Sequence, residues 1–417
     1  MDVREGDRLR ADLEGFVGEV FASLTRRGWQ DRSAAYLVGL MTDGRRKSVQ
    51  PMAARLGEVN EQSLQHFLAN TPWDPVPVRA AIARRMYPVV QPAGWVVDDT
   101  GYPKSGTSSP CVARQYSGTL GKTGNCQVST TVHLASDEAS CPVNWRLFVP
   151  ESWDPGSVKA PSDIAHRRAR CALPEAEVHR EKWRLALDAI DEILDWDIPV
   201  PPVLVADCGY GSNAYFRHGL TQRGIRYAVQ VAEDLRVLPA GAVRTTVPYS
   251  GLGPRPLAVY RDEPVTVKAF ITARGHRAAV RVAWRIGSKM RHGRHRPMAS
   301  RFVFTRVRPA GVASRRLHKG QDLPEVWLIA EWPASAKEPT RYWLSDLPAA
   351  MGRSKLIAAC KLRWRVEHDY RELKTGLGLD HYEGRKWAGW HHHVTLVAAA
   401  HAFCTLQRLH PKVHAPA

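Results

Sequence analysis

The stretch from Arg363 to Lys374 places one carboxylate between two cations, and these residue types point most directly to a binding or catalytic role. Arg363, Glu367 and Lys374 occur in one stretch with the pattern Arg-x3-Glu-x6-Lys. At about 100° per residue, Arg363 lies roughly 40° and Lys374 roughly 20° from Glu367 around a helix, so the three are expected on one face. Glu372, about 140° away from Glu367, is expected on another face. This arrangement suits a phosphate with a bound metal, and ordinary i,i+4 ion pairs on a solvated helix are the alternative explanation.

Two acidic motifs elsewhere in the chain favour the metal interpretation. Asp98 and Asp99 follow one short apolar run, and Asp207 follows another. Short aliphatic runs bounded by Pro or Gly are typical of buried strands. We expect an Asp at the carboxyl end of each strand, where ligands of open α/β sheets bind. The spacings are 207 − 98 = 109 and 367 − 207 = 160 residues, so only the fold can bring these acids to Glu367.

With these motifs the chain resembles the DDE-superfamily transposases, and within them the insertion-sequence-701 family of the broader insertion-sequence-4 lineage. The resemblance covers nearly the whole chain. It is carried by Asp98-Asp99-Thr100 with Lys104 and Gly106 following, by Asp207-Cys208-Gly209-Tyr210, and by Arg363-x3-Glu367-x6-Lys374 continuing into residues 377–385.

The resemblance implies an α/β fold with an RNase H-like mixed-sheet catalytic core. In such a core Asp98, Asp207 and Glu367 would hold two Mg²⁺ ions for cutting and joining DNA, and Mn²⁺ is expected to substitute. Mg²⁺ prefers hard oxygen ligands, and two such ions can activate an attacking water or 3′-hydroxyl and stabilise the leaving oxygen.

Two of these acids have alternative interpretations. Asp99 is the alternative to Asp98, because adjacent strand residues point to opposite faces, whereas the family pattern Asp-x-Thr favours Asp98. Asp207 has a structural alternative as a turn or cap residue before Gly209. The chain also departs from the wider lineage at Cys360, where the extended signature has Tyr. The departure bears on whether the protein holds a flipped DNA base, as some relatives do with aromatic residues near this helix. Trp364 either stacks on such a base or is a core residue of its helix.

Composition agrees with a nucleic-acid partner. Lys and Arg number 59 against 41 Asp and Glu, a formal charge of +18, which favours attraction to a polyanion. The basic run at 289–296 is expected to contact the DNA backbone. We see no long apolar span and no N-terminal signal peptide, so we expect a cytoplasmic, nucleoid-associated protein without a membrane partner. The expected DNA contacts are Arg363, Trp364, Arg371, Lys374, Lys104, Arg291, Arg294, Arg296, Gln62 and Gln65.

Apolar spacing and Pro/Gly punctuation predict four segments. Residues 1–90 read as an all-helical DNA-binding domain with a possible helix-turn-helix at 48–69, in which Gly57 makes the turn. Residues 91–232 form the first part of the core, and 349–417 complete it with the Glu-bearing helix and a C-terminal helix. Residues 233–348 read as an inserted β-rich subdomain.

The cysteines and the histidine run are residue types that can bind metals, but their spacing does not predict a metal site. The seven cysteines include no CxxC pair, so reduced and mostly buried thiols are expected rather than a zinc or disulfide framework. The run at 391–393 is three consecutive histidines, which on a helix point about 100° apart and cannot all reach one ion. We interpret it as a basic helix start.

The leading hypothesis is therefore a cut-and-paste insertion-sequence transposase. It would bind terminal inverted repeats as a homodimer, cleave them with Mg²⁺, and join the 3′ ends to target DNA. The alternatives are an RNase H-like nuclease without strand transfer and a domesticated or inactive transposase that only binds DNA.

Overall fold

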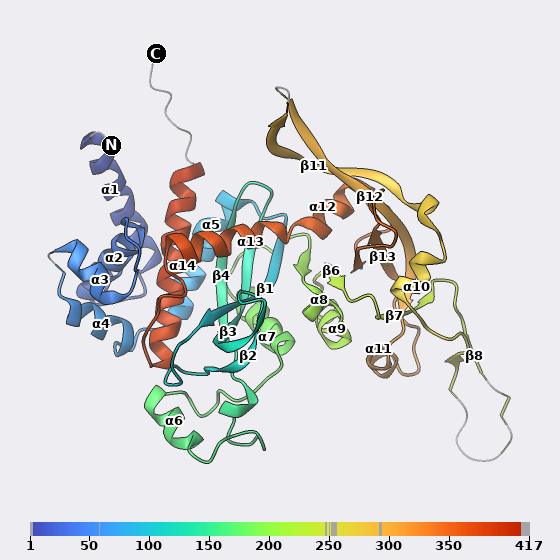
Figure 1. The fold of residues 1–417 in the computed structure, drawn as a ribbon, viewed down its shortest axis with the longest axis horizontal. Helices are drawn as coiled ribbons and strands as arrows, with labels where there is room; N and C mark the ends of the chain where they lie inside the picture. The colour runs from blue at the N-terminus through green and yellow to red at the C-terminus, as the bar shows by residue number, and fades with distance from the viewer. Residues whose placement is uncertain are drawn as a thin grey trace. The chain divides into compact units, whose positions relative to one another are not determined.

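The fold of the chain is mixed α/β (Figure 1). The computed structural model describes residues 3–57, 59–246, 248–249, 251, 257–291 and 294–409. It contains two compact units, of which unit 1 comprises Met1–Val200 with Trp364–Ala417 and unit 2 comprises Pro201–Arg363. In the part of the chain that is described, no helix has the length and apolar character needed to cross a membrane.

Helices form the start of unit 1, as the sequence predicts for residues 1–90. Gly57 ends α3 with a φ of 70°, a left-handed conformation that glycine adopts without steric cost. Asn60 then caps α4 by accepting a hydrogen bond from the Ser63 N–H at 2.9 Å. Helix α3 thus ends at Gly57 and α4 begins at Glu61, whereas a helix-turn-helix, DNA binding by this segment and its boundary at residue 90 stay predictions. The helices are α1 Val3–Val20, α2 Arg27–Met41, α3 Val49–Leu56, α4 Glu61–Ala69 and α5 Pro75–Val90.

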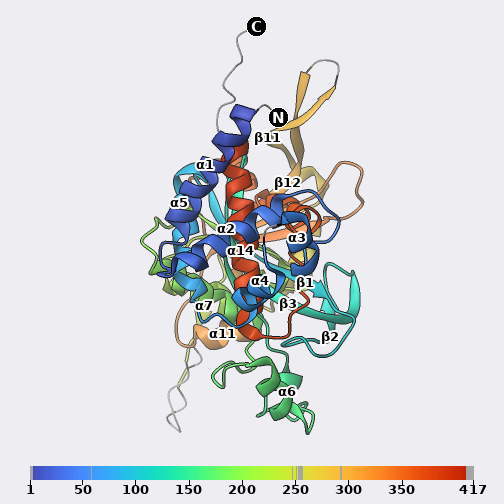
Figure 2. The ribbon, with the colours of Figure 1, turned by 90° about the vertical axis from the view of Figure 1, so that its left-hand side faces the viewer.

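Helix α14 (Trp387–Leu409) is the central element of unit 1. Most of its residues are buried, which is typical of a helix enclosed by other elements. It runs among α1, α2, α4 and α5 (Figure 2), and it also contacts β4. The helix therefore joins the N-terminal helices to the sheet of the same unit.

The three consecutive histidines lie in the first turns of α14, and the prediction that they form a basic helix start is wrong. The His392 ring stacks on Trp73 with 3.9 Å between centroids. Tyr36 Oη lies 2.9 Å from His393 Nδ1, while His393 Nε2 lies 3.2 Å from the Gly378 carbonyl oxygen. Burial lowers the pKa of His392 to about 4 and that of His393 to about 3. These rings are therefore neutral core groups.

Strand β3 (Lys122–Ala135) organises the sheet of unit 1, because it pairs antiparallel with β1, β2 and β4. The register places Asp98 opposite Thr131 and Asp99 opposite Thr130. Strand β1 continues to Pro103, so the prediction that Asp98 ends its strand is wrong. The residues after the apolar run keep pairing with β3 and are themselves mostly buried. The other elements are β1 Gly94–Pro103, β2 Ala113–Ser117, β4 Ser140–Leu147, η1 Glu151–Trp153, α6 Ile164–Cys171 and α7 Lys182–Leu194.

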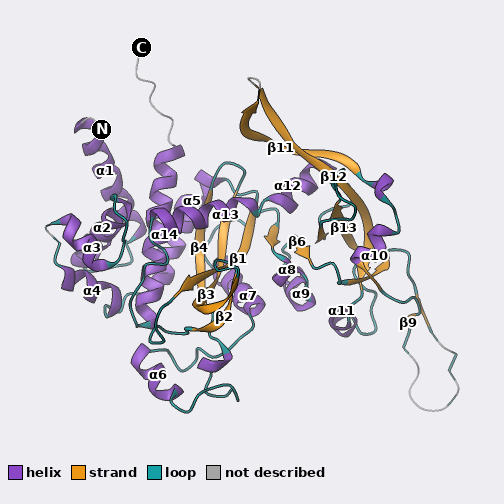
Figure 3. Ribbon diagram, viewed as in Figure 1, coloured by secondary structure: helices purple, strands orange, loops and turns teal. Residues whose placement is uncertain are grey.

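Unit 2 is built mainly from strands (Figure 3). Its main sheet has the order β10-β7-β12-β13-β14-β6-β5, with β11 beside β12. The pair β5–β6 is parallel, and α8 and α9 lie between these two strands in the chain, as a parallel connection requires. The elements are β5 Leu204–Ala206, α8 Cys208–Gly211, α9 Ala214–Gln222, β6 Tyr227–Val231, β7 Arg236–Pro239, β8 Arg244–Thr245, β9 Val259–Tyr260, β10 Val265–Thr266, α10 Val267–Thr272, η2 His276–Ala278, β11 Val280–Arg291, β12 Arg294–Pro309, α11 Val312–Leu317, β13 Val326–Glu331, β14 Arg341–Ser345 and α12 Arg353–Lys361.

Both strand arrangements of a mixed α/β fold are present. Unit 1 contains the antiparallel strands β1, β3 and β4, and unit 2 contains the parallel pair β5 and β6. Residues 233–348 contain β7 to β14, as expected for a β-rich segment. Within this segment residues 267–272 form a helix, α10, which the Thr266 hydroxyl caps by accepting from the Ala269 N–H at 3.1 Å.

Arg79 of α5 is a buried cation that ties three elements of unit 1 together. Its guanidinium donates to Thr395 Oγ1 at 2.8 Å and to the Trp145 carbonyl at 3.0 Å. Arg79→Leu should lower the free energy of unfolding by about 3 kcal/mol, because it leaves these buried acceptors without a donor. The measurement is urea denaturation. The control, Arg84→Leu, changes an exposed Arg of the same helix, and equal losses in the two variants would contradict the assigned role.

Candidate active site and nucleic-acid interface

Asp98 lies within β1 and is only 4% exposed. Its Oδ1 accepts a hydrogen bond from the Asp99 backbone N–H at 2.9 Å, which fixes the orientation of the carboxylate. The Thr131 hydroxyl, opposite on β3, donates to the Asp98 carbonyl oxygen at 3.1 Å. Asp98 is therefore a buried acid on a rigid pair of strands.

Tyr370 covers the side of the strands on which Asp98 lies. It belongs to α13 (Trp364–Arg371), and its hydroxyl is 2.5 Å from Thr131 Oγ1. Burial, together with the negative charge of the nearby Asp98, raises the pKa of Tyr370 well above its ordinary value. The phenol is therefore neutral, and it joins α13 to β3 beside the Asp98 carboxylate.

Asp99 has different partners. Its Oδ2 forms an ion pair with Lys182 Nζ at 2.7 Å, and its Oδ1 accepts from the Thr130 hydroxyl at 3.3 Å. Because successive strand residues point to opposite faces, Asp99 faces the Lys182 end of α7, whereas Asp98 faces Tyr370. The two acids that the sequence left as alternatives thus differ clearly in their surroundings.

Glu367 is exposed on α13, three residues before Tyr370. At about 100° per residue the two side chains are roughly 60° apart around the helix, so Glu367 emerges from the side of α13 that Tyr370 turns towards β1 and β3. Unit 1 therefore holds both Asp98 and Glu367, and it connects their elements through the Tyr370–Thr131 contact.

The prediction of one continuous helical face from Arg363 to Lys374 is wrong. Helix α13 begins at Trp364, and Glu372–Gly376 form a π-helix, which changes the angular steps that a regular α-helix would give. Lys374 Nζ donates to the Gly101 carbonyl at 2.8 Å and to Thr119 Oγ1 at 2.7 Å. Burial lowers the pKa of Lys374 to about 8. This lysine therefore anchors the end of β1.

Asp207 belongs to unit 2 and directly follows β5, as the sequence predicts. Its Oδ1 accepts from the Gly209 N–H at 2.9 Å and from the Tyr210 N–H at 3.3 Å, so the cap role considered from the sequence is present. Gly211 in the same short helix cannot carry a side chain, because a Cβ there would lie 2.0 Å from the Gln230 carbonyl oxygen of β6. Cap and close packing together fix Asp207 at the end of β5.

The residues predicted to contact DNA differ in how exposed their side chains are and in what they contact. Lys104 Nζ donates to the Tyr382 carbonyl oxygen and lies over the Tyr382 ring, and burial lowers its pKa to about 8. Trp364 is half-buried and lies 5.6 Å from the Arg365 guanidinium. Arg363, half-buried, precedes α13 and belongs to unit 2. Four of the predicted residues are exposed, namely Gln62, Gln65, Arg296 and Arg371, whereas the side chains of Arg291 and Arg294 lie outside the described residues.

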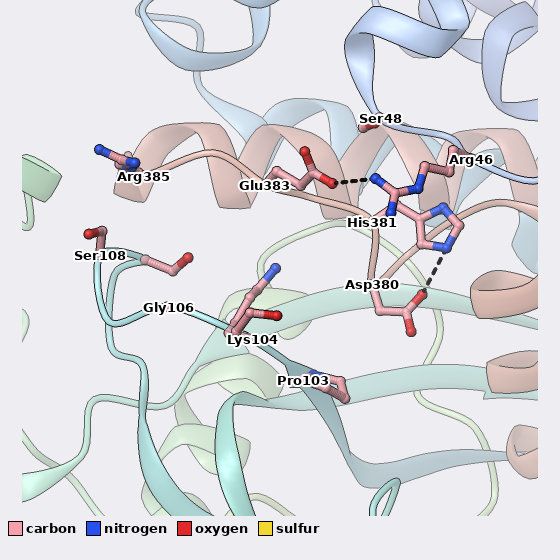
Figure 4. A pocket seen from close by; sticks show the side chains of 12 residues that line it. Arg46, Ser48, Pro103, Lys104, Gly106, Ser108, Asp380, His381, Glu383 and Arg385 are labelled. Carbon is pink, nitrogen blue, oxygen red and sulfur yellow. Dashed lines mark ion pairs between the residues drawn. The ribbon is translucent and has the colours of Figure 1, made fainter.

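A pocket of about 480 Å³ in unit 1 is lined by several cationic side chains and serine hydroxyl groups (Figure 4). Two of its acids have cationic partners: Glu383 lies 3.6 Å from Arg46, and Asp380 lies 3.8 Å from the His381 ring. Lys104 and Gly106, which belong to the family motif, line the pocket together with the run that follows Lys374. The lining residues are Arg46, Ser48, Pro103, Lys104, Ser105, Gly106, Ser108, Ser109, Asp380, His381, Glu383 and Arg385.

Sequence reasoning missed the polar contacts that hold α13. Asp369 is 1% exposed, and it accepts from the Ser140 hydroxyl at 2.5 Å and lies 3.1 Å from His133 Nδ1. Thr131 and His133 are two residues apart on β3, and this alternation of polar side chains in the sequence is the signal for a shared polar face. His368, Asp369 and Glu372 also have possible metal-ligating atoms within 4.8 Å of one another. None of the three belongs to the predicted Asp-Asp-Glu set.

Comparison with known proteins supports the family suggested by these motifs. Residues 19–291 match the family described as DDE superfamily endonuclease, and residues 180–403 match the transposase DDE domain. Over 115 residues the chain is 34% identical to a probable transposase for insertion sequence element IS701 from Microchaete diplosiphon. That alignment spans 27% of this chain and 30% of the relative. With family matches over more than half of its length, the chain belongs to the DDE superfamily of endonucleases and transposases.

Proposed function

We propose that this chain is an insertion-sequence transposase that cuts DNA at terminal inverted repeats and joins the 3′ ends to target DNA. The observation that carries the proposal is the position of Asp98. This acid lies on the face of β1 and β3 that Tyr370 covers, and Tyr370 belongs to the helix that presents Glu367. Family membership supplies the reaction class.

The proposed metal ligands are Asp98, Asp207 and Glu367. Their oxygen donors suit Mg²⁺, with Mn²⁺ as a substitute. Bound as a pair, such ions activate the attacking oxygen and stabilise the leaving oxygen of a phosphodiester. Asp99 is the weaker candidate, because Lys182 and Thr130 already occupy its two oxygens.

The chain's own residues position these acids. The Asp99 N–H orients the Asp98 carboxylate, and the N-terminal amides of α8 orient Asp207 through its Oδ1. Tyr370, whose hydroxyl contacts Thr131, holds α13 and with it Glu367 against the strands. We assign Tyr370 a positioning role.

Two surfaces of unit 1 are proposed to bind DNA. Exposed Gln62 and Gln65 on α4, the second helix of the helix-turn-helix, are of the residue type that reads bases in the major groove. The pocket of Figure 4 presents Arg46 and Arg385 beside several serine hydroxyls, a set that suits backbone phosphates. Arg363, Trp364, Arg371, Lys374, Lys104, Arg291, Arg294 and Arg296 remain proposed contacts. A homodimer on paired ends and a cytoplasmic, nucleoid-associated location also belong to this proposal.

Substitution of the proposed ligands should abolish cleavage without abolishing DNA binding. Asp98→Asn, Asp207→Asn and Glu367→Gln should each lower Mg²⁺-dependent cutting of the element's ends at least about 1,000-fold, because each removes a charge that stabilises the transition state. Asp99→Asn is the matched control, and it should retain cutting. The assay measures cleavage and strand transfer on DNA that carries the sequences flanking the gene.

The same assay separates the alternatives. Cutting without joining by the wild type would favour a nuclease. Tight binding of the ends with no cutting in Mg²⁺ or Mn²⁺ would favour a DNA-binding descendant. If Asp99→Asn were inactive while Asp98→Asn remained active, the assignment of the first ligand would be reversed.

The two proposed DNA surfaces should differ in what they recognise. Replacing Gln62 and Gln65 together by Ala should reduce the preference for end DNA over random DNA by about 1–3 kcal/mol per lost base contact. Arg385→Ala should weaken binding to both DNAs and lower the slope of log K against log salt by about 1. Arg10→Ala, on the exposed side of α1, is the control. Equal salt slopes for wild type and Arg385→Ala would remove the pocket from the interface.

A further inference from the structure

We propose that His368, Asp369, Glu372 and His401 form a transition-metal site of their own, apart from the Asp98, Asp207 and Glu367 carboxylates. The first three have candidate ligand atoms within 4.8 Å of one another. His401, from α14, extends this group: its Nε2 lies 3.3 Å from Glu372 Oε2 and 3.9 Å from Asp369 Oδ1. All four residues belong to unit 1.

The side chain of His401 is the observation that points to a ligand. It is 2% exposed. Neither of its ring nitrogens meets hydrogen-bond geometry with a described residue, and the Nε2 atom has Glu372 Oε2 at an ion-pair distance of 3.3 Å. His368 Nδ1, which lies 3.5 Å from Glu372 Oε1, also lacks a hydrogen-bond partner. A buried polar atom left without a partner costs about 1–3 kcal/mol. Coordination of a metal ion by these nitrogens accounts for atoms that the protein alone leaves unsatisfied.

The distances fit a four-coordinate ion. For metal–ligand bonds of about 2.0–2.1 Å in tetrahedral geometry, neighbouring ligand atoms are about 3.4 Å apart. From His401 Nε2, the separations of 3.3 Å to Glu372 Oε2 and 3.9 Å to Asp369 Oδ1 lie near this value. His368 Nδ1 lies 3.5 Å from the other Glu372 oxygen, Oε1, so a shared ion requires a small rotation of the Glu372 carboxylate or of the His368 ring. Two imidazoles and two carboxylates suit Zn²⁺, or Mn²⁺ with added water, better than they suit Mg²⁺.

Hydrogen bonds from neighbouring side chains hold the Asp369 carboxylate in place, as is common for carboxylates that bind metal ions. The Ser140 hydroxyl donates to its Oδ1 at 2.5 Å, and His133 Nδ1 lies 3.1 Å from its Oδ2. Arg365 Nε in turn donates to Ser140 Oγ at 3.2 Å. Outer contacts of this kind orient metal-binding carboxylates. The π-helix begins at Glu372, and such turns are frequent at functional sites.

Arg408 is the one cation that competes with a metal at this cluster within the described part of unit 1. Its Nη1 donates to Glu372 Oε1 at 3.2 Å. Ion pairs between His401 and the two carboxylates would likewise need no metal. These residues define the alternative that the experiment must exclude, which is a charge network without an ion.

The test counts metal on the full chain without DNA, so it does not depend on the proposed transposition reaction. Chelator-treated protein is dialysed against Zn²⁺ or Mn²⁺ and its metal content is measured, and Zn²⁺ affinity is obtained by competition with a chromogenic chelator. Wild type should bind one Zn²⁺. His401→Gln and His368→Gln should each lower the Zn²⁺ affinity at least about 100-fold, because losing a metal ligand should weaken binding more than losing a residue that only supports a ligand. His368 is half-exposed, so its variant addresses the site if His401→Gln fails to fold.

Glu367→Gln is the control that separates this site from the proposed catalytic ligands. It should retain the Zn²⁺ and should lose only metal bound at the Asp-Asp-Glu set. The proposal is overturned if wild type binds Zn²⁺ no more tightly than the two histidine variants. It is also overturned if Glu367→Gln removes all bound metal.

Discussion

The attachment of α13 to the strands of unit 1 is the constraint on which the candidate site depends. Glu367 is exposed and Asp98 is buried, so a shared ligand position requires the helix to be fixed on the sheet. The attachment includes three polar contacts: Tyr370 contacts Thr131, and Asp369 contacts both His133 and Ser140. Buried polar contacts have defined directions, and they specify one arrangement where apolar packing would tolerate sliding.

The same unit joins this helix to the proposed DNA-binding helices. α14 packs on α1, α2, α4 and α5 and also on β4, while Arg79 and the neutral ring of His393 bond across these elements. Helix α14 is therefore a buried, hydrogen-bonded connection between α4 and the sheet of unit 1. The grouping of both parts in unit 1 fits this arrangement.

Sequence reasoning predicted the element types better than their ends. It predicted helices within residues 1–90 and the acid after β5, because caps, glycines and apolar runs are local signals. It placed Asp98 at a strand end, whereas β1 continues to Pro103, since pairing with β3 is a long-range effect. It treated 363–374 as one regular helix, and no local pattern revealed the π-helix that begins at Glu372. The role of Asp369 depends on strands more than 200 residues away, which spacing cannot indicate.

The most direct test of the central claim is cleavage of the polypeptide by radicals generated at bound Fe²⁺. Fe²⁺ replaces Mg²⁺ at oxygen sites, and with ascorbate and peroxide it cuts the backbone next to its ligands. If Asp98, Asp207 and Glu367 share the metal ions, the end-DNA complex should be cut near all three, with Mg²⁺ competing. Asp98→Asn should then lose the cut near Asp207 together with the cut near its own position. Cuts near Asp207 that persist in Asp98→Asn would contradict a shared site.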